Sequence, residues 1–318
     1  SINPSCVDAY NNLGIAFKYQ GNFDKAILAY KKAISIKPEF VEAHLNLSFA
    51  LLNIGEFYEG IYEYEWRWKT LKGKLSQRHF SVPLWDGKKS LIGKRILVWS
   101  EQGVGDTINW SLFLLFITSK VGHCILECQQ KLVPLLKNSF PNIEVSTENK
   151  TLDTKRNDID FHIPMGSLCR HFYSSIKYKS KIRPHLVPDP TRVNFWKKQF
   201  NTLGKGPYIG ICWKSLKTSP NRLQNNSNIL QWKSILKIPD VKFINLQPKR
   251  FEDDIKKIYN EFGVTVHNFD DIDHFNDLYD VSALISALDM VISTKTTVPL
   301  IAAGVGTKTK LANWRQSS

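Results

Sequence analysis

The spacing of apolar residues along the chain changes character near residue 73. Before that point, apolar residues recur every three or four positions, which predicts amphipathic helices. From Lys94 onward, short apolar runs alternate with helical stretches, a pattern typical of parallel sheets wound with helices. We therefore expect an α-helical region at 1–72, a basic connector at 73–93 and an α/β region from residue 94.

The α/β region is predicted to form two domains of similar design. Its predicted strands are 95–100, 123–127, 159–163, 208–213, 241–246, 264–267 and 289–293. Its predicted helices fall near 106–119, 130–138, 190–202, 230–236, 251–261 and 279–287. Proline and glycine clusters at 184–190 and 204–207 interrupt this pattern, so we place the boundary near residue 200 and expect Rossmann-like domains at 94–200 and 201–318.

The helical region repeats itself with a period of 34 residues, which relates 7–40 to 41–74. The matching pairs include Tyr10 with His44, Leu13 with Leu47, Gly21 with Gly55 and Ile27 with Ile61. The pattern, with small residues at Gly14, Ala26 and Ala33, resembles the tetratricopeptide repeat (TPR). That resemblance implies two helices per unit and a concave face that binds peptides or proteins, with a rigid spacer or a dimerisation arm as the alternative. Because Pro4 stands where an earlier unit would close, we expect the chain to be a fragment of a longer array.

The second repeat departs from this pattern at Tyr64–Trp68, where aromatic residues and Arg67 replace small ones. A helix that faces solvent has no need of such residues, so we expect the segment to pack onto the domain that follows. Arg67 is expected either to stack on an aromatic ring or to pair with a carboxylate. The connector contains Pro83–Gly87 and is expected to wrap across the same junction.

One turn in the first α/β domain combines glycines with a carboxylate. The apolar run Ile96–Trp99 predicts a strand buried on both faces, and Gly103, Gly105 and Asp106 follow it just before a helical pattern begins. The turn therefore lies at the carboxyl end of a strand, where open parallel sheets bind ligands and where glycines let backbone N–H groups approach them. Asp106 has two interpretations, a helix N-cap and a general base facing the cleft.

A polar, cationic loop follows the predicted strand 208–213 in the second domain. Its basic residues include Lys214, Lys217 and Arg222. They are interpreted either as groups that neutralise a diphosphate or as solvated loop charges.

Hydroxyl side chains follow the predicted strand 289–293 at the start of another helix. Thr296 and Thr297 lead there into the small apolar run Ile301–Gly304. Hydroxyls and free N–H groups at a helix start suit a phosphate group. Plain N-capping by either threonine explains the same residues.

Together these motifs resemble bacterial fusions of TPR repeats to a glycosyltransferase related to the lipopolysaccharide heptosyltransferases. The matching segments lie in order along nearly the whole chain, at Tyr64–Trp68, Pro83–Gly87, Glu101–Asp106, Gly210–Trp213, Leu246–Gln247 and Ser282–Thr297. The resemblance implies the GT-B fold, in which two Rossmann-like domains face each other. The second domain then holds most of the donor nucleotide sugar, and the acceptor approaches from the first.

The resemblance also implies a role for individual residues. Asp106 would be the base that deprotonates the acceptor hydroxyl. The residues implied in donor binding are Gly103, Gly105, Trp213, Lys214, Ser215, Arg222, Gln247, Thr296 and Thr297. The chain departs from the family pattern at Lys295 and Leu300, where many relatives have Asp and His, and it stops at Ser318, where relatives continue into a helix that packs across the cleft. We therefore expect a truncated second domain.

We expect an inverting, metal-independent glycosyltransferase that takes a nucleotide-sugar donor, with repeats that recruit an acceptor protein or glycan. The alternative is a non-catalytic TPR scaffold that carries a degenerate glycosyltransferase domain. A dinucleotide-dependent enzyme ranks below both, because Gly103-Val104-Gly105 lacks the third glycine of that fingerprint.

Charge narrows the choice of partners. The net charge of +14, from 43 basic and 29 acidic residues, favours anionic partners such as nucleotides or a membrane surface. The basic residues form only short pairs, so no nucleic-acid-binding arm is predicted. No apolar run approaches the ~20 residues that a bilayer span needs. We expect a cytoplasmic protein without a transmembrane segment, and peripheral membrane contact stays open.

No metal site or other cofactor is expected. The five cysteines lack the paired spacing of a zinc site and are interpreted as reduced thiols. The triplets Asp158-Ile159-Asp160 and Asp271-Ile272-Asp273 have the spelling that another glycosyltransferase architecture uses to hold a divalent metal. We interpret both as strand-edge or loop carboxylates.

Overall fold

The computed structural model describes residues 6–177, 184–215, 226–248 and 251–312 of the 318-residue chain. The chain divides into two compact units. The first comprises Ser1–Ser90 and Asn149–Ser180, and the second comprises Leu91–Glu148 and Lys181–Ser318. The predicted domain boundaries at 94 and 200 do not coincide with this division, because the segment 149–180 groups with the amino-terminal residues.

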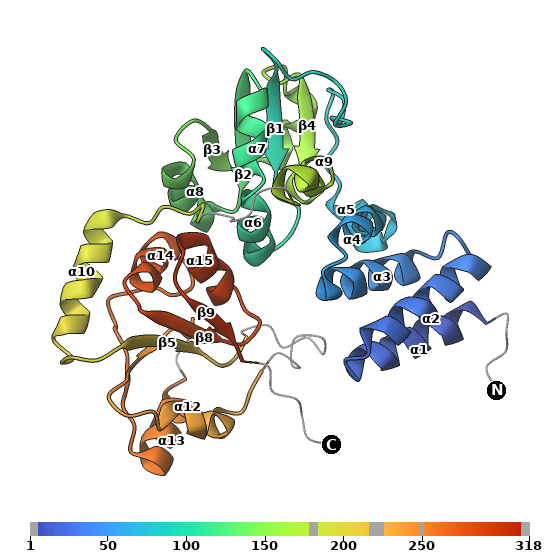
Figure 1. The fold of residues 1–318 in the computed structure, drawn as a ribbon. Coiled ribbons are helices and arrows are strands. Elements are labelled where there is room, and N and C mark those ends of the chain that lie inside the picture. Colours follow the sequence, from blue (N-terminus) through green and yellow to red (C-terminus); the bar gives the residue numbers. More distant parts are fainter. Residues whose placement is uncertain (1–5, 178–183, 216–225, 249–250, 313–318) are drawn as a thin grey trace. The chain divides into compact units, whose positions relative to one another are not determined.

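The first unit opens with two helical hairpins, which follow the 34-residue period (Figure 1). Their helices are α1 (Val7–Tyr19), α2 (Phe23–Ile36), α3 (Val41–Ile54) and α4 (Phe57–Tyr64). Gly14 is required on α1 because a Cβ there would lie 2.4 Å from the ring of Tyr30, which is fully buried on α2. Gly55 ends α3 with φ at 88°, a left-handed conformation that favours glycine. The two-helix unit predicted from the period is confirmed.

The helical pattern breaks where the sequence analysis placed the departure. Helix α4 ends at Tyr64, and the chain continues as the 3-10 helix η1 (Glu65–Lys69) and then as α5 (Leu71–Ser76). The Arg67 guanidinium lies 4.5 Å from the Tyr64 ring centre and 4.7 Å from that of Trp68. It also donates to Glu65 Oε1 at 2.5 Å and to Ser167 Oγ at 2.8 Å. Both interpretations of Arg67 are therefore confirmed, and the helix it reaches is α9 (Met165–Lys177).

The connector packs onto this later segment of the first unit. Arg78 and Asp153 form a buried two-point ion pair, with Arg78 Nε donating to Asp153 Oδ2 at 2.8 Å. Asp153 lies on the 3-10 helix η4 (Lys150–Lys155). The backbone N–H of Trp85 donates to the carbonyl of His162, on strand β4 (Phe161–Pro164), at 2.9 Å, and the Trp85 ring lies 5.9 Å from the Phe172 ring centre. The connector is thus tied to η4, β4 and α9 within the first unit.

The first part of the second unit is built on parallel strands. Strand β1 (Arg95–Trp99) pairs with β2 (His123–Cys128), and β2 pairs with β3 (Glu144–Thr147). Residues Ile96–Val98 are fully buried, as expected for a strand covered on both faces. The helical elements here are α6 (Val104–Ser111), α7 (Leu114–Ile117), η2 (Thr118–Lys120), η3 (Gln130–Leu132) and α8 (Val133–Ser139).

The remainder of the second unit holds a parallel sheet in the order β7-β6-β5-β8-β9. Its strands are β5 (Tyr208–Cys212), β6 (Lys242–Asn245), β7 (Val266–His267), β8 (Met290–Ser293) and β9 (Thr309–Leu311). Its helical elements are α10 (Pro190–Asn201), η5 (Ile229–Trp232), α12 (Lys233–Leu236), α13 (Glu252–Phe262), α14 (Leu278–Ser286) and α15 (Val298–Val305). Figure 1 shows α14 and α15 side by side near β8 and β9.

The predicted fold class, α-helical repeats followed by α/β, is confirmed. The elements that were not predicted include β3, β9 and α9. The predicted helix 106–119 is broken at Leu112 and Phe113, between α6 and α7. Within the described part of the chain, no helix has both the length and the apolar character to span a bilayer.

Candidate functional site

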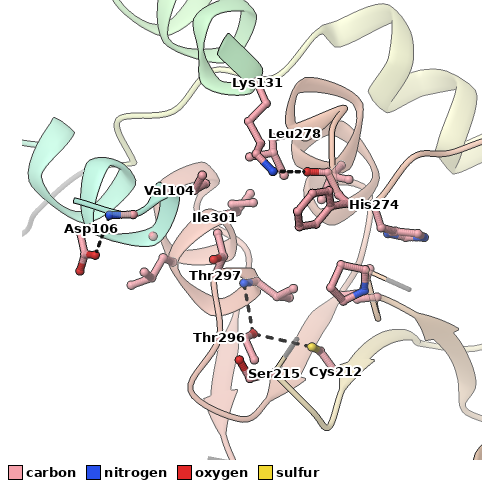
Figure 2. A pocket seen from close by; sticks show the side chains of 18 of the residues that line it. Val104, Asp106, Lys131, Cys212, Ser215, His274, Leu278, Thr296, Thr297 and Ile301 are labelled. Carbon is pink, nitrogen blue, oxygen red and sulfur yellow. Dashed lines mark hydrogen bonds between the residues drawn. The ribbon is translucent and has the colours of Figure 1, made fainter. Parts of the chain in front are cut away.

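A cavity of about 400 Å³ lies within the second unit, at the carboxyl ends of its parallel strands (Figure 2). Its wall is formed by the turn after β1, by the residues after β2, and by the residues that follow β5 and β8. Seven of the predicted site residues line it, namely Gly103, Gly105, Asp106, Lys214, Ser215, Thr296 and Thr297. The structure therefore brings together residues from three separate loops of the sequence.

Asp106 is the third residue of α6, and the N-cap is Gly103. The interpretation of Asp106 as the N-cap itself is therefore wrong, although its Oδ2 does accept a hydrogen bond from the Gly103 N–H at 3.2 Å. A carboxylate at this place stabilises the first turn of a helix. Its other oxygen makes no hydrogen bond within the described ranges and stays available to a ligand in the cavity.

Gly105 brings the start of α6 against the start of α15. A Cβ at Gly105 would lie 3.2 Å from Leu300 Cδ1 and 3.4 Å from Thr297 Oγ1. A side chain at this position would therefore require Leu300 to shift by a few tenths of an ångström. Leu300, which stands where the resemblance expects histidine, lines the cavity and contributes an apolar surface there.

The threonine turn before α15 is already hydrogen-bonded in part. Thr296 Oγ1 accepts from the Val298 N–H at 3.3 Å and lies 3.6 Å from the Cys212 thiol (Figure 2). The N–H groups of Leu300 and Ile301 both donate to the Thr297 carbonyl at 3.1 Å. The N-cap of α15 is Thr297, whose side chain makes no cap hydrogen bond, so the N–H of the first helical residue is satisfied by the preceding Thr296 instead. The N–H groups of Val298, Leu300 and Ile301, at the helix start, therefore have partners.

Cys212 lines the same cavity at the end of β5. Burial raises the pKa of its thiol to about 11, so the group stays protonated at neutral pH. A protonated thiol is a weak nucleophile, and this one lies within hydrogen-bond distance of the Lys214 carbonyl and the Thr296 hydroxyl.

A network beneath the cavity holds the residues after β5 in place. Lys214 Nζ donates to Asp254 Oδ2 at 2.5 Å, and Trp213 Nε1 donates to the same oxygen at 2.9 Å. Gln247 Oε1 accepts from the backbone N–H groups of Trp213 at 2.7 Å and Lys214 at 3.0 Å. The side chains of Trp213 and Gln247 are buried and do not line the cavity. Trp213 and Gln247 therefore support the cavity wall and are not part of it. The predicted site residue Arg222 and the nearby Lys217 lie outside the described residues.

Several wall residues were not singled out from the sequence. Lys131 follows β2, and His274, Phe275 and Leu278 lie before and at the start of α14. Neither ring nitrogen of His274 has a hydrogen-bond partner in the described structure, and burial lowers its pKa to about 4. The position of Lys131 just after a predicted strand was the signal that could have identified it.

The two Asp-x-Asp triplets are not assembled into a metal site in the described structure. Asp158 pairs with Arg156, whose Nε donates to Asp158 Oδ1 at 2.6 Å. Asp273 accepts from the backbone N–H groups of Phe275 and Asn276, both at 2.9 Å, and so fixes a turn. Asp158 and Asp273 therefore each have a partner within the chain.

Comparison with known proteins finds similarities for both parts of the chain. The tetratricopeptide repeat family model matches residues 7–40. Protein FlbA of Caulobacter vibrioides is 27% identical over an alignment of 356 positions, which covers 96% of this chain and 60% of FlbA. The chain therefore spans less than two thirds of that relative. The peroxisomal targeting signal receptor of Kluyveromyces lactis is 38% identical over 58 residues, or 18% of this chain.

The solved structure of a family 9 glycosyl transferase from Veillonella parvula covers 68% of this chain and 80% of its own, with a TM-score of 0.52 at 10% identity. At that identity the likeness concerns the fold. The chain thus begins with a tetratricopeptide repeat and continues with an α/β region that has the fold of a family 9 glycosyltransferase.

Proposed function

We propose that this protein transfers a sugar, of the hexose or heptose class, from a nucleotide-sugar donor to an acceptor hydroxyl. The observation that carries the proposal is the gathering of Asp106, Lys214 and the threonine turn (Thr296 and Thr297) around one cavity at the carboxyl ends of parallel strands. Such a cavity offers a base for the acceptor beside groups suited to a diphosphate. The fold likeness to a glycosyl transferase supports the same reaction class.

In the proposed reaction, the free oxygen of Asp106 takes the proton of the acceptor hydroxyl. The acceptor oxygen then attacks the anomeric carbon, and the bond from that carbon to the diphosphate oxygen breaks. The nucleoside diphosphate leaves with the bonding electrons, and attack opposite to it inverts the anomeric centre. A positioned base contributes about 10²- to 10⁴-fold to such a rate.

Charge stabilisation of the leaving diphosphate is assigned to Lys214 and the amino-terminal end of α15, so we propose that no divalent metal is needed. Transfer should then persist when the protein is assayed in excess EDTA. Loss of transfer in EDTA, restored by added Mg²⁺ or Mn²⁺, would contradict this part of the proposal.

We further propose that the repeats recruit the acceptor, which is a protein or a glycan. The family-model match to a repeat class with a concave peptide-binding face supports this role. Deleting the repeats is unsuitable as a test because η1 packs on α9 through Arg67 and Ser167. Surface substitutions on α1 and α3 that lower transfer to a protein acceptor, while sparing donor hydrolysis, would agree with recruitment.

The test of catalysis is transfer and hydrolysis across a panel of UDP-, GDP-, ADP- and CMP-sugars. Asp106→Asn should lower turnover by about 10²- to 10⁴-fold and leave donor affinity unchanged, because the amide oxygen can still accept from the Gly103 N–H. Asp253→Asn, an exposed carboxylate on α13, is the matched control and should change neither. Full turnover in Asp106→Asn would exclude it as the base.

A non-catalytic scaffold is the second candidate, and two observations favour it. Leu300 replaces a histidine in the cavity wall, and Lys214 is already neutralised by Asp254. Absence of nucleotide-sugar binding across the whole panel, in protein shown to be folded, would support this scaffold and reject the transferase.

A further inference from the structure

Lys131 is held at the edge of the cavity by two contacts to one residue. It lies on η3 just after β2, and its Nζ donates to the Phe275 carbonyl at 2.9 Å (Figure 2). The same ammonium group lies 3.5 Å from the centre of the Phe275 ring. The turn that presents Phe275 is fixed by Asp273, which accepts from the Phe275 N–H. Lys131 therefore reaches from the strand end of β2 to the loop before α14.

Lys131 also belongs to the wall of a second hollow. It lines both the 400 Å³ cavity and an adjoining hollow of about 560 Å³ whose wall includes Asp273 and Asp277. The side chain thus stands between the two spaces. Its release from Phe275 would change the shape of the cavity that holds Asp106.

The two amines in the described part of the cavity wall differ in how their charge is balanced. Lys214 forms an ion pair with Asp254 at 2.5 Å. Lys131 contacts a neutral carbonyl and an aromatic face, and within the described ranges no carboxylate lies within 4.0 Å of it. Burial lowers the pKa of Lys131, an effect that Asp273 partly offsets. A charge that is partly desolvated and has no carboxylate in direct contact gains more from an incoming anion than one already paired.

We propose that Lys131 binds the diphosphate group of the nucleotide donor and that Phe275 is its resting place when the cavity is empty. The inference rests on the proposed function, since that function supplies the diphosphate. A phosphate oxygen carries negative charge, so the ammonium group gains there a Coulombic attraction that the neutral Phe275 carbonyl does not provide. The long, flexible lysine side chain can exchange one acceptor for the other without movement of the backbone.

The test compares Lys131→Gln with Lys137→Gln, which removes the same charge from an exposed position on α8 outside the cavity wall. Each protein is titrated calorimetrically with UDP, GDP, ADP and CDP, with the corresponding nucleosides and with inorganic pyrophosphate. Lys131→Gln should bind its nucleoside diphosphate about 10- to 100-fold more weakly, with nucleoside affinity unchanged. Lys137→Gln should behave like the wild type.

The outcomes separate this inference from the proposed function. Equal diphosphate affinity in Lys131→Gln and the wild type would overturn the role of Lys131 and leave the transferase standing. Pyrophosphate binding that depends on Lys131, without binding of any nucleotide, would support the role of Lys131 and reject the nucleotide-sugar donor. Failure of the wild type to bind either pyrophosphate or a nucleotide would overturn both.

Phe275→Leu gives a second measurement that does not alter the charge. It removes the aromatic face and keeps the backbone carbonyl, so the resting position is weakened and Lys131 is released more easily. Diphosphate affinity should rise by about 2- to 5-fold. A fall in diphosphate affinity in this variant would overturn Phe275 as a competing resting place.

Discussion

Gln247 is expected to stabilise the cavity from below, and Gln247→Met tests this. Its side chain is 1% exposed and accepts hydrogen bonds from the backbone N–H groups of Trp213 and Lys214. It also donates to the Lys214 carbonyl at 3.2 Å. Methionine has a similar volume and leaves little cavity, so the substitution removes chiefly these three hydrogen bonds.

The expected loss follows from the two backbone donors that are left without an acceptor. A buried donor left unsatisfied costs about 1–3 kcal/mol. The Trp213 N–H is fully buried, whereas Lys214 is only half-buried, so the second contribution lies at the low end of this range. Together the two unsatisfied donors lower the local free energy of unfolding by about 2–4 kcal/mol. The population of the locally unfolded state then rises roughly 30- to 1,000-fold.

Hydrogen exchange followed by mass spectrometry measures this loss directly, on peptides that cover β5 and the residues after it. Exchange of these amides should accelerate by the stated factor, while peptides from α1 and α2 keep their wild-type rates. Gln231→Met is the matched control. The Gln231 side chain is exposed and accepts from the Asn228 N–H at 3.0 Å, so its loss should change local stability by less than about 1 kcal/mol.

Unchanged exchange around β5 in Gln247→Met would refute the supporting role. If nucleotide binding were then lost at the same time, Gln247 would contact the donor directly, as the family resemblance implies. Accelerated exchange together with weakened binding would instead mean that the residue acts through the position of Lys214.

Two further predictions concern stability. Asp153→Asn should destabilise the first unit by about 3–5 kcal/mol in denaturant unfolding, because it leaves the buried Arg78 charge without its partner. The control Asp158→Asn removes a half-exposed carboxylate and should cost less than about 1 kcal/mol. Equal losses in the two variants would refute the stabilising role of the buried ion pair. The melting temperature should fall as the pH decreases from about 6.5 towards 4. The pKa of His274 is lowered to about 4, so between these values the unfolded chain binds a proton that the folded protein excludes. His274→Phe should make the melting temperature depend less steeply on pH. An unchanged pH dependence in this variant would contradict the assignment to His274.

The helical repeats could be read from the sequence because their determinants are local. A 34-residue period, small residues such as Gly14 and the glycine at position 55 fix where each helix begins, ends and meets its neighbour. Buried parallel strands are similarly evident, because a run such as Ile96–Val98 is apolar on both faces. Strand β3 escaped prediction because its residues Glu144–Thr147 are mostly polar and its register is set by β2.

The assignment of segment 149–180 to the first unit depended on partners far apart in the chain. Arg78 meets Asp153 and Arg67 meets Ser167 across 75 and 100 positions of sequence. The sequence pattern does not predict such a pairing, because each of these residues taken alone is compatible with an exposed loop.

The cavity, too, could be predicted from the sequence only in part. The sequence alone indicated that loops after predicted strands would carry Asp106, Lys214 and Thr297, because parallel strands present their carboxyl ends on one edge. Only the tertiary structure decided that Gln247 lies beneath that edge and that Lys131 rests on Phe275. Whether a polar side chain faces a cavity or supports its wall depends on packing in three dimensions, which residue type and spacing do not specify.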